Sequence, residues 1–238
     1  MVTALIFAGG TGQRMNSRSK PKQFLELHGK PVIIYTIEVF EQHSEIDNIV
    51  VVCLESWIEE LKVELHKSFI HKVNLIVSGG ETGHDSIYNG LRAMESSTKG
   101  DDIVLIHDGV RPLVTKELIS QNIKKVKEYG NAISVAPAAE TVTKVDENGM
   151  IEEVPNRDCT YIAKAPQSFY FNDIWEGYQK AHQEGFKSID STHLMNRYGY
   201  ELHTVTCSPY NMKITAPSDY YVFRALYEAM ENQQIFGI

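Results

Sequence analysis

The chain has 238 residues, 42% hydrophobic and 23% charged, which suits one large α/β domain or two small ones. A formal net charge of −8 excludes a broad basic surface for nucleic acid, so any phosphate chemistry needs a local cluster of cations. The N-terminus lacks a basic segment and a long apolar run, which predicts a cytoplasmic protein without signal peptide or membrane span. The widely spaced Cys53, Cys159 and Cys207 suit a reducing compartment and form no metal-binding pattern.

Short apolar runs alternate with stretches of helical periodicity through the first 136 residues. The expected strands are residues 4–8, 49–54, 73–77, 103–107 and 132–136, and the expected helices are residues 32–42, 55–68, 85–94 and 115–129. Thr115 is placed to cap the last of these helices, and Gly130 to end it. The alternation predicts a mostly parallel α/β sheet with helices on both faces, whose ligands bind beyond the carboxyl ends of the strands.

The pattern breaks between about residues 139 and 161. The run ETVTKVDENGMIEEV (residues 140–154) alternates around Asn148-Gly149, which predicts a projecting β-hairpin arm. A polar hairpin buries little surface alone, so we expect it to dimerise with a second copy; a surface flap without a partner is the alternative. A helix near residues 172–184, a strand at 202–207 and a helix from Pro217 complete one expected domain, residues 1–238.

A glycine-rich loop follows the first expected strand. It reads AGGTGQRM (residues 8–15), directly after Phe7, and PKQF follows at residues 21–24. Small residues let the backbone approach a phosphate chain, with exposed amides facing the anion. Arg14 and Lys22 flank the loop and could neutralise charge on a transferring phosphoryl group and its pyrophosphate, although two solvated surface cations would give the same pattern. Met15 stands where a dinucleotide fingerprint has its last glycine, and no P-loop lysine follows.

A second motif, HDGVRP (residues 107–112), follows another expected strand. An aspartate at the carboxyl end of a parallel strand, here Asp108, can hold a Mg²⁺ that bridges nucleotide phosphates. Arg111 could bind a substrate phosphate with two hydrogen bonds. The alternative is that Asp108 and Arg111 pair with each other and brace the turn. We interpret His107 as a structural polar group.

Two further segments carry candidate ligand-binding groups. The loop GGETGHDS (residues 79–86) offers amides and a hydroxyl to a base or ribose, and Asp85 or Ser86 is expected to cap the following helix. The segment NMKIT (residues 211–215) is expected to place Lys213 in a strand. A lysine there is costly to bury, so Lys213 should be exposed or paired with an anion.

Taken together, AGGTGQRM with PKQF, HDGVRP, PNR (residues 155–157) with APQSF (165–169), and NMKIT resemble the sugar-phosphate cytidylyltransferase family over nearly the whole chain. The resemblance implies a Rossmann-like domain, a β-arm that forms a homodimer, and transfer of CMP from CTP to a polyol phosphate with release of pyrophosphate. The AGG opening, PKQFLEL and VPNR before APQSF resemble enzymes for ribitol 5-phosphate, which would supply CDP-ribitol to a cell-wall polymer such as teichoic acid. Methylerythritol 4-phosphate, used in isoprenoid synthesis, is the alternative acceptor.

The resemblance also implies roles for individual residues. Those expected to bind CTP are Phe7, Ala8, Gly9, Gly10, Gly80, Glu81, Thr82, Gly83, His84, Asp85 and Ser86. Those expected in catalysis are Arg14, Lys22, Arg157 and Lys213; those expected to contact the polyol phosphate are Asp108, Arg111 and Thr141, with Asp108 also near the Mg²⁺. Thr141 and Arg157 would reach the partner's pocket. Since the acceptor phosphate is already ionised near neutral pH, no protein base is needed, and catalysis becomes positioning and charge neutralisation.

The chain departs from the family pattern in three places. Ala165 stands where a threonine is usual, Gly83-His84 replaces an arginine-bearing stretch, and residues 189–192 lack the usual threonine–aspartate pair. Another pentitol or tetritol phosphate therefore stays open as acceptor. Two other classes are alternatives: a non-catalytic nucleotide-binding protein, disfavoured by the retained cations, and a dinucleotide-dependent oxidoreductase, disfavoured by Met15.

Overall fold

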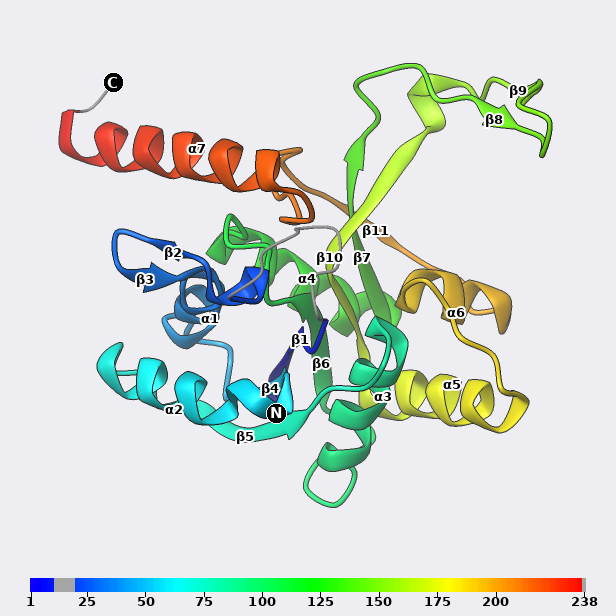
Figure 1. Ribbon diagram of the computed structural model, residues 1–238. Coiled ribbons are helices and arrows are strands. Elements are labelled where there is room, and N and C mark those ends of the chain that lie inside the picture. Colours follow the sequence, from blue (N-terminus) through cyan, green and yellow to red (C-terminus); the bar gives the residue numbers. More distant parts are fainter. Residues whose placement is uncertain (11–19, 237–238) are drawn as a thin grey trace.

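The computed structural model describes residues 1–10 and 20–236, and its centre is a seven-stranded sheet in the order β11-β7-β10-β6-β1-β4-β5 (Figure 1). Its strands are β1 (Val2–Ala8), β4 (Asn48–Cys53), β5 (Val73–Ser78), β6 (Ile103–Asp108), β7 (Asn131–Pro137), β10 (Tyr161–Tyr170) and β11 (Thr204–Thr206). Only β10 runs antiparallel to its neighbours, β6 and β7; the other pairs are parallel. The mostly parallel α/β sheet is confirmed.

Helices cover both faces of the sheet. They are α1 (Val32–Glu41), α2 (Ile58–Lys67), α3 (Gly83–Met94), α4 (Lys116–Tyr129), α5 (Phe171–Glu184), α6 (Ser191–Arg197) and α7 (Pro217–Phe236). Alternate side chains of β1 enter different cores, as the twofold period of a strand requires. Ile6 shares a core with Ile37 of α1 and Ile123 of α4, whereas Leu5 shares the other core with Leu91 of α3 and Tyr178 of α5. The helices therefore fix the sheet from two sides.

The ends of two helices show how local chemistry sets their positions. Thr115 caps α4 by accepting the Leu118 amide at 3.2 Å, and Gly130 ends the helix with φ +86°, as predicted. The prediction that Asp85 or Ser86 caps α3 is wrong, because Thr82 is the N-cap. The Thr82 hydroxyl accepts the Asp85 amide while the Asp85 carboxylate accepts the Thr82 amide, a reciprocal capping box. The helix therefore begins at Gly83.

The predicted arm lies between β7 and β10 and projects away from the body of the sheet (Figure 1). Its elements are the antiparallel strands β8 (Lys144–Val145) and β9 (Ile151–Glu153) and the short 3₁₀ helix η4 (Arg157–Cys159). Gly149 supplies the positive φ of the turn, +83°. The Asp146 carboxylate accepts the Asn148 and Met150 amides at 2.9 and 2.8 Å, which closes the turn. The hairpin prediction is confirmed.

The structure corrects the expected strand at residues 211–215. This segment has no regular secondary structure, and a backbone hydrogen bond from the Ile214 amide to the Val110 carbonyl at 2.9 Å joins it to the loop after β6. It lacks a partner strand because the neighbouring β10 is already paired on both sides, with β6 and β7.

None of the helices in residues 1–10 and 20–236 has the length and apolar character that a bilayer crossing needs.

The remaining short elements lie between β1 and β5. They are the 3₁₀ helices η2 (Lys22–Phe24) and η3 (Glu55–Trp57) and the two-residue strands β2 (Glu26–Leu27) and β3 (Lys30–Pro31), which pair with each other. The ring centroids of Phe24 in η2 and Trp57 in η3 lie 4.6 Å apart. This contact anchors the segment that returns to the sheet after the glycine-rich loop.

Candidate active site

The candidate site lies at the carboxyl ends of β1 and β6, which are neighbours in the sheet. The chain runs from β1 to β4 and β5 on one side and later returns to place β6 on the other. Such a switch point leaves a crevice where ligands of α/β sheets bind. Phe7 at the end of β1 pairs in register with Asp108 at the end of β6. The first two predicted motifs therefore meet there.

Glycines allow two loops to touch at this edge. A Cβ atom on Gly9 would lie 2.6 Å from the Ser86 hydroxyl and 2.9 Å from the Gly79 Cα, closer than side chains pack. Gln23, which is fully buried, donates from Nε2 to the carbonyls of Ala8 at 2.7 Å and Gly10 at 3.2 Å. The start of the glycine-rich loop thus packs against the loop after β5, and the Gln23 side chain fixes its backbone.

These loops line a cavity of about 530 Å³, here called the glycine-loop cavity. Its lining comprises Phe7, Ala8, Gly9, Gly10, Lys22, Gln23, Glu81, Gly83, Ser86, Asp108, Val110, Lys213 and Thr215. Seven of the residues predicted to bind CTP are among them. Thr82 and Asp85 instead close the capping box, and the Gly80 amide donates to the Ser86 hydroxyl at 3.1 Å. Arg14 lies outside the described residues.

A second cavity of about 330 Å³, the β10 cavity, adjoins the first. It is lined by Phe7, Gly83, His84, Ile87, Ile106, Asp108, Arg111, Ala163, Lys164, Ala165, Gln167, Tyr178, Ile189, Asp190, Ser191 and Lys213. Four of these residues, Phe7, Gly83, Asp108 and Lys213, also line the glycine-loop cavity. Two ligands bound in the two cavities would therefore meet at one shared wall. His84, predicted to bind CTP, faces the β10 cavity.

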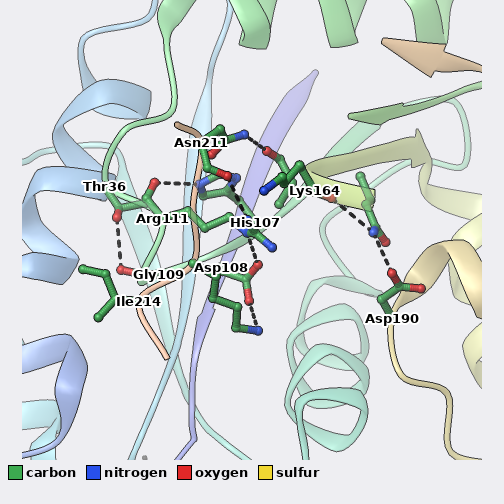
Figure 2. A network of polar contacts seen from close by, with 12 residues as sticks. Thr36, His107, Asp108, Gly109, Arg111, Lys164, Asp190, Asn211 and Ile214 are labelled. Atoms are coloured by element: carbon green, nitrogen blue, oxygen red, sulfur yellow. Dashed lines mark hydrogen bonds and ion pairs between the residues drawn. The ribbon is translucent and has the colours of Figure 1, made fainter. Parts of the chain in front are cut away.

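Asp108 is the centre of the shared wall (Figure 2). Its buried carboxylate accepts from Arg111 Nε at 2.7 Å and forms an ion pair with Lys213. Arg111 also donates from Nη1 to the Asn211 carbonyl at 2.9 Å. Burial disfavours the charge, but Lys213 and Arg111 outweigh it and hold the pKa of Asp108 well below its ordinary value. Asp108 is ionised, Arg111 braces the turn, and Lys213 is paired with an anion as expected.

Two other polar groups support this centre. His107 is fully buried with Nε2 3.2 Å from the Arg111 carbonyl, and burial lowers its pKa to about 4. It is therefore neutral at physiological pH and acts as a structural polar group. Lys22 donates from Nζ to the Ile214 carbonyl at 3.0 Å, which ties η2 to the segment that carries Lys213. Lys22 and Lys213 both lie on the wall of the glycine-loop cavity.

The two predicted site residues on the arm do not join this cluster. Thr141 and Arg157 are exposed on the arm and line neither cavity of their own chain. Within one chain, the structure therefore assembles Lys22, Asp108 and Lys213, with Arg111 next to them, and leaves the arm residues outside.

The sequence patterns did not single out three polar residues that shape the site. They are Gln23, which holds the glycine-rich loop; Lys164, which lines the β10 cavity; and Asn211, which donates to the Ala165 carbonyl at 2.5 Å. Each stands in or beside a quoted motif: PKQF, APQSF and NMKIT. An amide directly after a glycine-rich loop was the available signal for Gln23. The other two depend on contacts between β10 and segments far away in sequence.

A glycine-lined cavity at the switch point of an α/β sheet, joined to a second cavity at a wall that carries Asp108 and Lys213, is the arrangement expected of a nucleotidyltransferase. Residues 2–228 match the family model described as "IspD: 2-C-methyl-D-erythritol 4-phosphate cytidylyltransferase". The chain therefore belongs to the IspD family of cytidylyltransferases. It is an enzyme of the class expected from its motifs, and neither the non-catalytic nor the oxidoreductase alternative is supported.

Individual relatives agree with this assignment. The chain is 48% identical, over 100% of both chains, to a ribitol-5-phosphate cytidylyltransferase of Vibrio parahaemolyticus serotype O3:K6 (strain RIMD 2210633). It is 40% identical to a 2-C-methyl-D-erythritol 4-phosphate cytidylyltransferase of Clostridium botulinum (strain 657 / Type Ba4), over 91% of this chain and 93% of the relative. The crystal structure of 4-diphosphocytidyl-2C-methyl-D-erythritol synthase from Anaerococcus prevotii DSM 20548 superposes with a TM-score of 0.83 at 28% identity, covering 95% and 96% of the two chains.

Proposed function

We propose that this enzyme transfers CMP from CTP to D-ribitol 5-phosphate, giving CDP-ribitol and pyrophosphate. The observation that carries the proposal is the wall shared by two cavities, where Asp108 and Lys213 face both. The choice of ribitol rests on the full-length 48% identity to a ribitol-5-phosphate cytidylyltransferase. CDP-ribitol would then serve a cell-wall polymer such as teichoic acid.

CTP fits the glycine-loop cavity. The amides of Gly9 and Gly10 lie in a loop that Gln23 fixes, so they are ordered before the nucleotide arrives. Lys22 and Lys213 supply positive charge at the same cavity. Arg14, on the remainder of the loop, would add a third cation beside the triphosphate.

The polyol phosphate fits the β10 cavity, which offers both cations and neutral polar groups. Figure 2 shows the Lys164 side chain reaching from β10 toward Arg111. Burial and the Arg111 charge lower the pKa of Lys164, and across residues 1–10 and 20–236 no carboxylate forms an ion pair with it. An anionic acceptor would supply the missing negative charge. Asp190, which accepts from Gln167 Nε2 at 3.1 Å, offers an acceptor to hydroxyl groups.

The reaction follows from the position of the shared wall. An oxygen of the acceptor phosphate attacks the α-phosphorus of CTP, and the bond to the β-phosphate oxygen breaks, so pyrophosphate leaves with the electron pair. Lys213 can neutralise charge where the two substrates meet, and Lys22 can do so beside the leaving group. The protein provides positioning and charge, because the attacking phosphate needs no deprotonation.

Mg²⁺ would accompany the nucleotide. In the part of the chain that the structure describes, no three His, Cys, Asp or Glu side chains gather into a metal site. Asp108 is the carboxylate at the shared wall, and both of its oxygens face cations. A single ionised carboxylate suits a Mg²⁺ held chiefly by phosphate oxygens, and Asp108 would have to release Lys213 to become one of its ligands. The bound ion would neutralise charge on the phosphates.

We also propose that the arm forms a homodimer. The arm and the first two residues of β10 expose several large apolar side chains, namely Val142, Val145, Met150, Ile151, Val154, Tyr161 and Ile162. Covering them with a second copy would bury apolar surface and bring Thr141 and Arg157 toward the partner's β10 cavity.

We further propose that the protein acts in the cytoplasm. Three free thiols, on Cys53, Cys159 and Cys207, fit a reducing compartment of this kind.

The test is pyrophosphate release with CTP and Mg²⁺, comparing ribitol 5-phosphate and methylerythritol 4-phosphate side by side. We expect fast release with ribitol 5-phosphate alone. A Lys22→Ala variant is the matched control, because this substitution should lower pyrophosphate release by the enzyme but leave release by contaminating phosphatases unchanged. If pyrophosphate is released with methylerythritol 4-phosphate but not with ribitol 5-phosphate, the proposed acceptor is wrong and the proposed mechanism stands. If no pyrophosphate is released with either acceptor, the proposal is refuted.

Methylerythritol 4-phosphate remains the second candidate acceptor. The matching family model carries that activity in its description, and relatives with that name reach 40% identity. The mechanism would be unchanged, because both acceptors present a phosphate to the shared wall.

A further inference from the structure

The β10 cavity has a cationic side and a side that carries hydrogen-bonding groups without positive charge. Arg111, Lys164 and Lys213 bring positive charge to one part of its wall. His84, Asp190 and Ser191 form another part, on α3 and around the start of α6, and none of these three lines the glycine-loop cavity. An anionic head and a hydroxylated tail would each find matching groups in such a cavity.

His84 is held in one orientation and one tautomer. Its Nδ1 accepts from the Ser188 amide at 3.3 Å and lies 3.0 Å from the Ser188 hydroxyl. A backbone N–H can only donate, so Nδ1 carries the lone pair and the neutral ring has its proton on Nε2. The ring also packs on Tyr178, with centroids 4.8 Å apart. Burial lowers the pKa of His84, which favours this neutral form.

The Nε2–H of His84 is a donor still to be used. Within the described chain Nε2 forms no hydrogen bond. It is also not one of the fully buried polar atoms without a partner, so Nε2 retains some exposed surface. His84 lines the β10 cavity and Ser188, at its Nδ1 edge, does not, so we infer that the Nε2 edge is the one that faces the cavity. A buried ring fixed on one side and open to a cavity on the other is arranged to donate to a ligand.

We propose that His84 is a specificity-determining residue that donates a hydrogen bond from Nε2 to a hydroxyl oxygen on the tail of the polyol phosphate acceptor. The inference rests on the proposed function, because it takes the β10 cavity to be the acceptor site. The phosphate lies toward Lys213, where transfer occurs, and the carbon chain extends toward His84. A shorter polyol phosphate would leave this donor unpaired, so the enzyme discriminates by acceptor length.

The test compares the wild-type enzyme with His84→Phe, which keeps a flat ring against Tyr178 and removes the donor. Calorimetric titration gives the affinity for ribitol 5-phosphate and, separately, for CTP. We expect about tenfold weaker ribitol 5-phosphate binding, as loss of one hydrogen bond implies, and unchanged CTP binding. His84→Gln, which restores an N–H donor, should recover part of the loss. His203→Phe is the matched control, because His203 also stacks on a tyrosine, Tyr129, outside both cavities.

A second acceptor sharpens the result. Erythritol 4-phosphate is one hydroxymethylene unit shorter, so the preference of wild-type enzyme for ribitol 5-phosphate should shrink about tenfold in His84→Phe. Equal affinity of wild-type and His84→Phe enzyme for ribitol 5-phosphate would overturn the inference, as would a wild-type enzyme that does not bind it. If the wild type binds ribitol 5-phosphate through His84 but releases no pyrophosphate, the proposed function fails while the role of His84 stands.

Discussion

Replacing Asp108 by asparagine should lower the stability of the folded protein, whatever the substitution does to activity. The variant keeps the size of the side chain but leaves Arg111 and Lys213 without their carboxylate. Arg111 is 11% exposed and Lys213 is 36% exposed, so water can rehydrate the lysine far better than the arginine. Breaking a buried ion pair by removing one partner costs about 3–5 kcal/mol. Because the asparagine oxygen can still accept one hydrogen bond, we expect about 3 kcal/mol.

A loss of that size corresponds to a fall in Tm of about 6–12 °C for a chain of this length. Urea unfolding monitored by circular dichroism would measure it, provided that the slope of the transition is unchanged. The double variant Asp108→Asn/Arg111→Met removes the stranded charge and should recover much of the stability. An Asp108→Asn protein as stable as wild type would show that the pair contributes no net stability.

The same pair makes stability depend on pH in a defined direction. Asp108 has its pKa lowered in the folded state, so the unfolded chain binds its proton first as the pH falls. Its contribution is therefore complete above the unfolded value of about 3.9 and is lost progressively below it. The difference in unfolding free energy between wild type and Asp108→Asn should shrink as the pH falls through this range. A difference that stays constant would contradict the assigned charge state.

Lys22→Ala should lower turnover roughly a hundredfold and change CTP affinity little, because the charge it meets grows in the transition state. Steady-state kinetics decide, and an unchanged turnover number would remove Lys22 from the mechanism. Gly9→Ala should weaken CTP binding, since its Cβ would overlap the Ser86 hydroxyl and push the two loops apart; normal binding in a titration would show that the loops yield easily. Ile151→Asp, at an arm residue 63% exposed, should convert a dimer into monomers by light scattering. A wild-type protein that is already monomeric would refute the arm's role.

Much of the fold could be predicted because several of the sheet strands are mainly apolar runs. Strands such as β4 (Asn48–Cys53) and β6 (Ile103–Asp108) are buried on both faces and bounded by polar residues, so their lengths are clear in the sequence. β10 was missed for the opposite reason. It contains Lys164 and Pro166, and a proline within a run argues against a central strand. The structure accommodates the proline at a register shift between Ala163 and Gln167, which no local pattern signals.

The candidate site was predictable where function depends on residue type at a strand end. Asp108 and the glycine-rich loop follow strands directly, so the topology alone brings them together. Lys213 was recognised from its motif, although its segment is not a strand. The surroundings of Lys164 and the orientation of His84 needed the structure, because they depend on residues far away in sequence, namely Arg111 for Lys164, and Ser188 and Tyr178 for His84.

Under the proposed function, the pairing of Asp108 with Lys213 would link stability to catalysis. Without substrate, the carboxylate supplies the negative charge that Lys213 needs, so the lysine is already directed at the shared wall. Phosphates entering both cavities would compete for the same ammonium group, and Lys213, more exposed than Arg111, is the partner that can turn toward them. Arg111, tied to Asn211 as well as to Asp108, would then hold the carboxylate in place. Under the proposed function, the site would keep a fixed pair, Asp108 with Arg111, and one more exposed cation, Lys213, free to turn toward phosphates. Such a centre would hold charge ready for the transfer step while the protein stays stable without substrate.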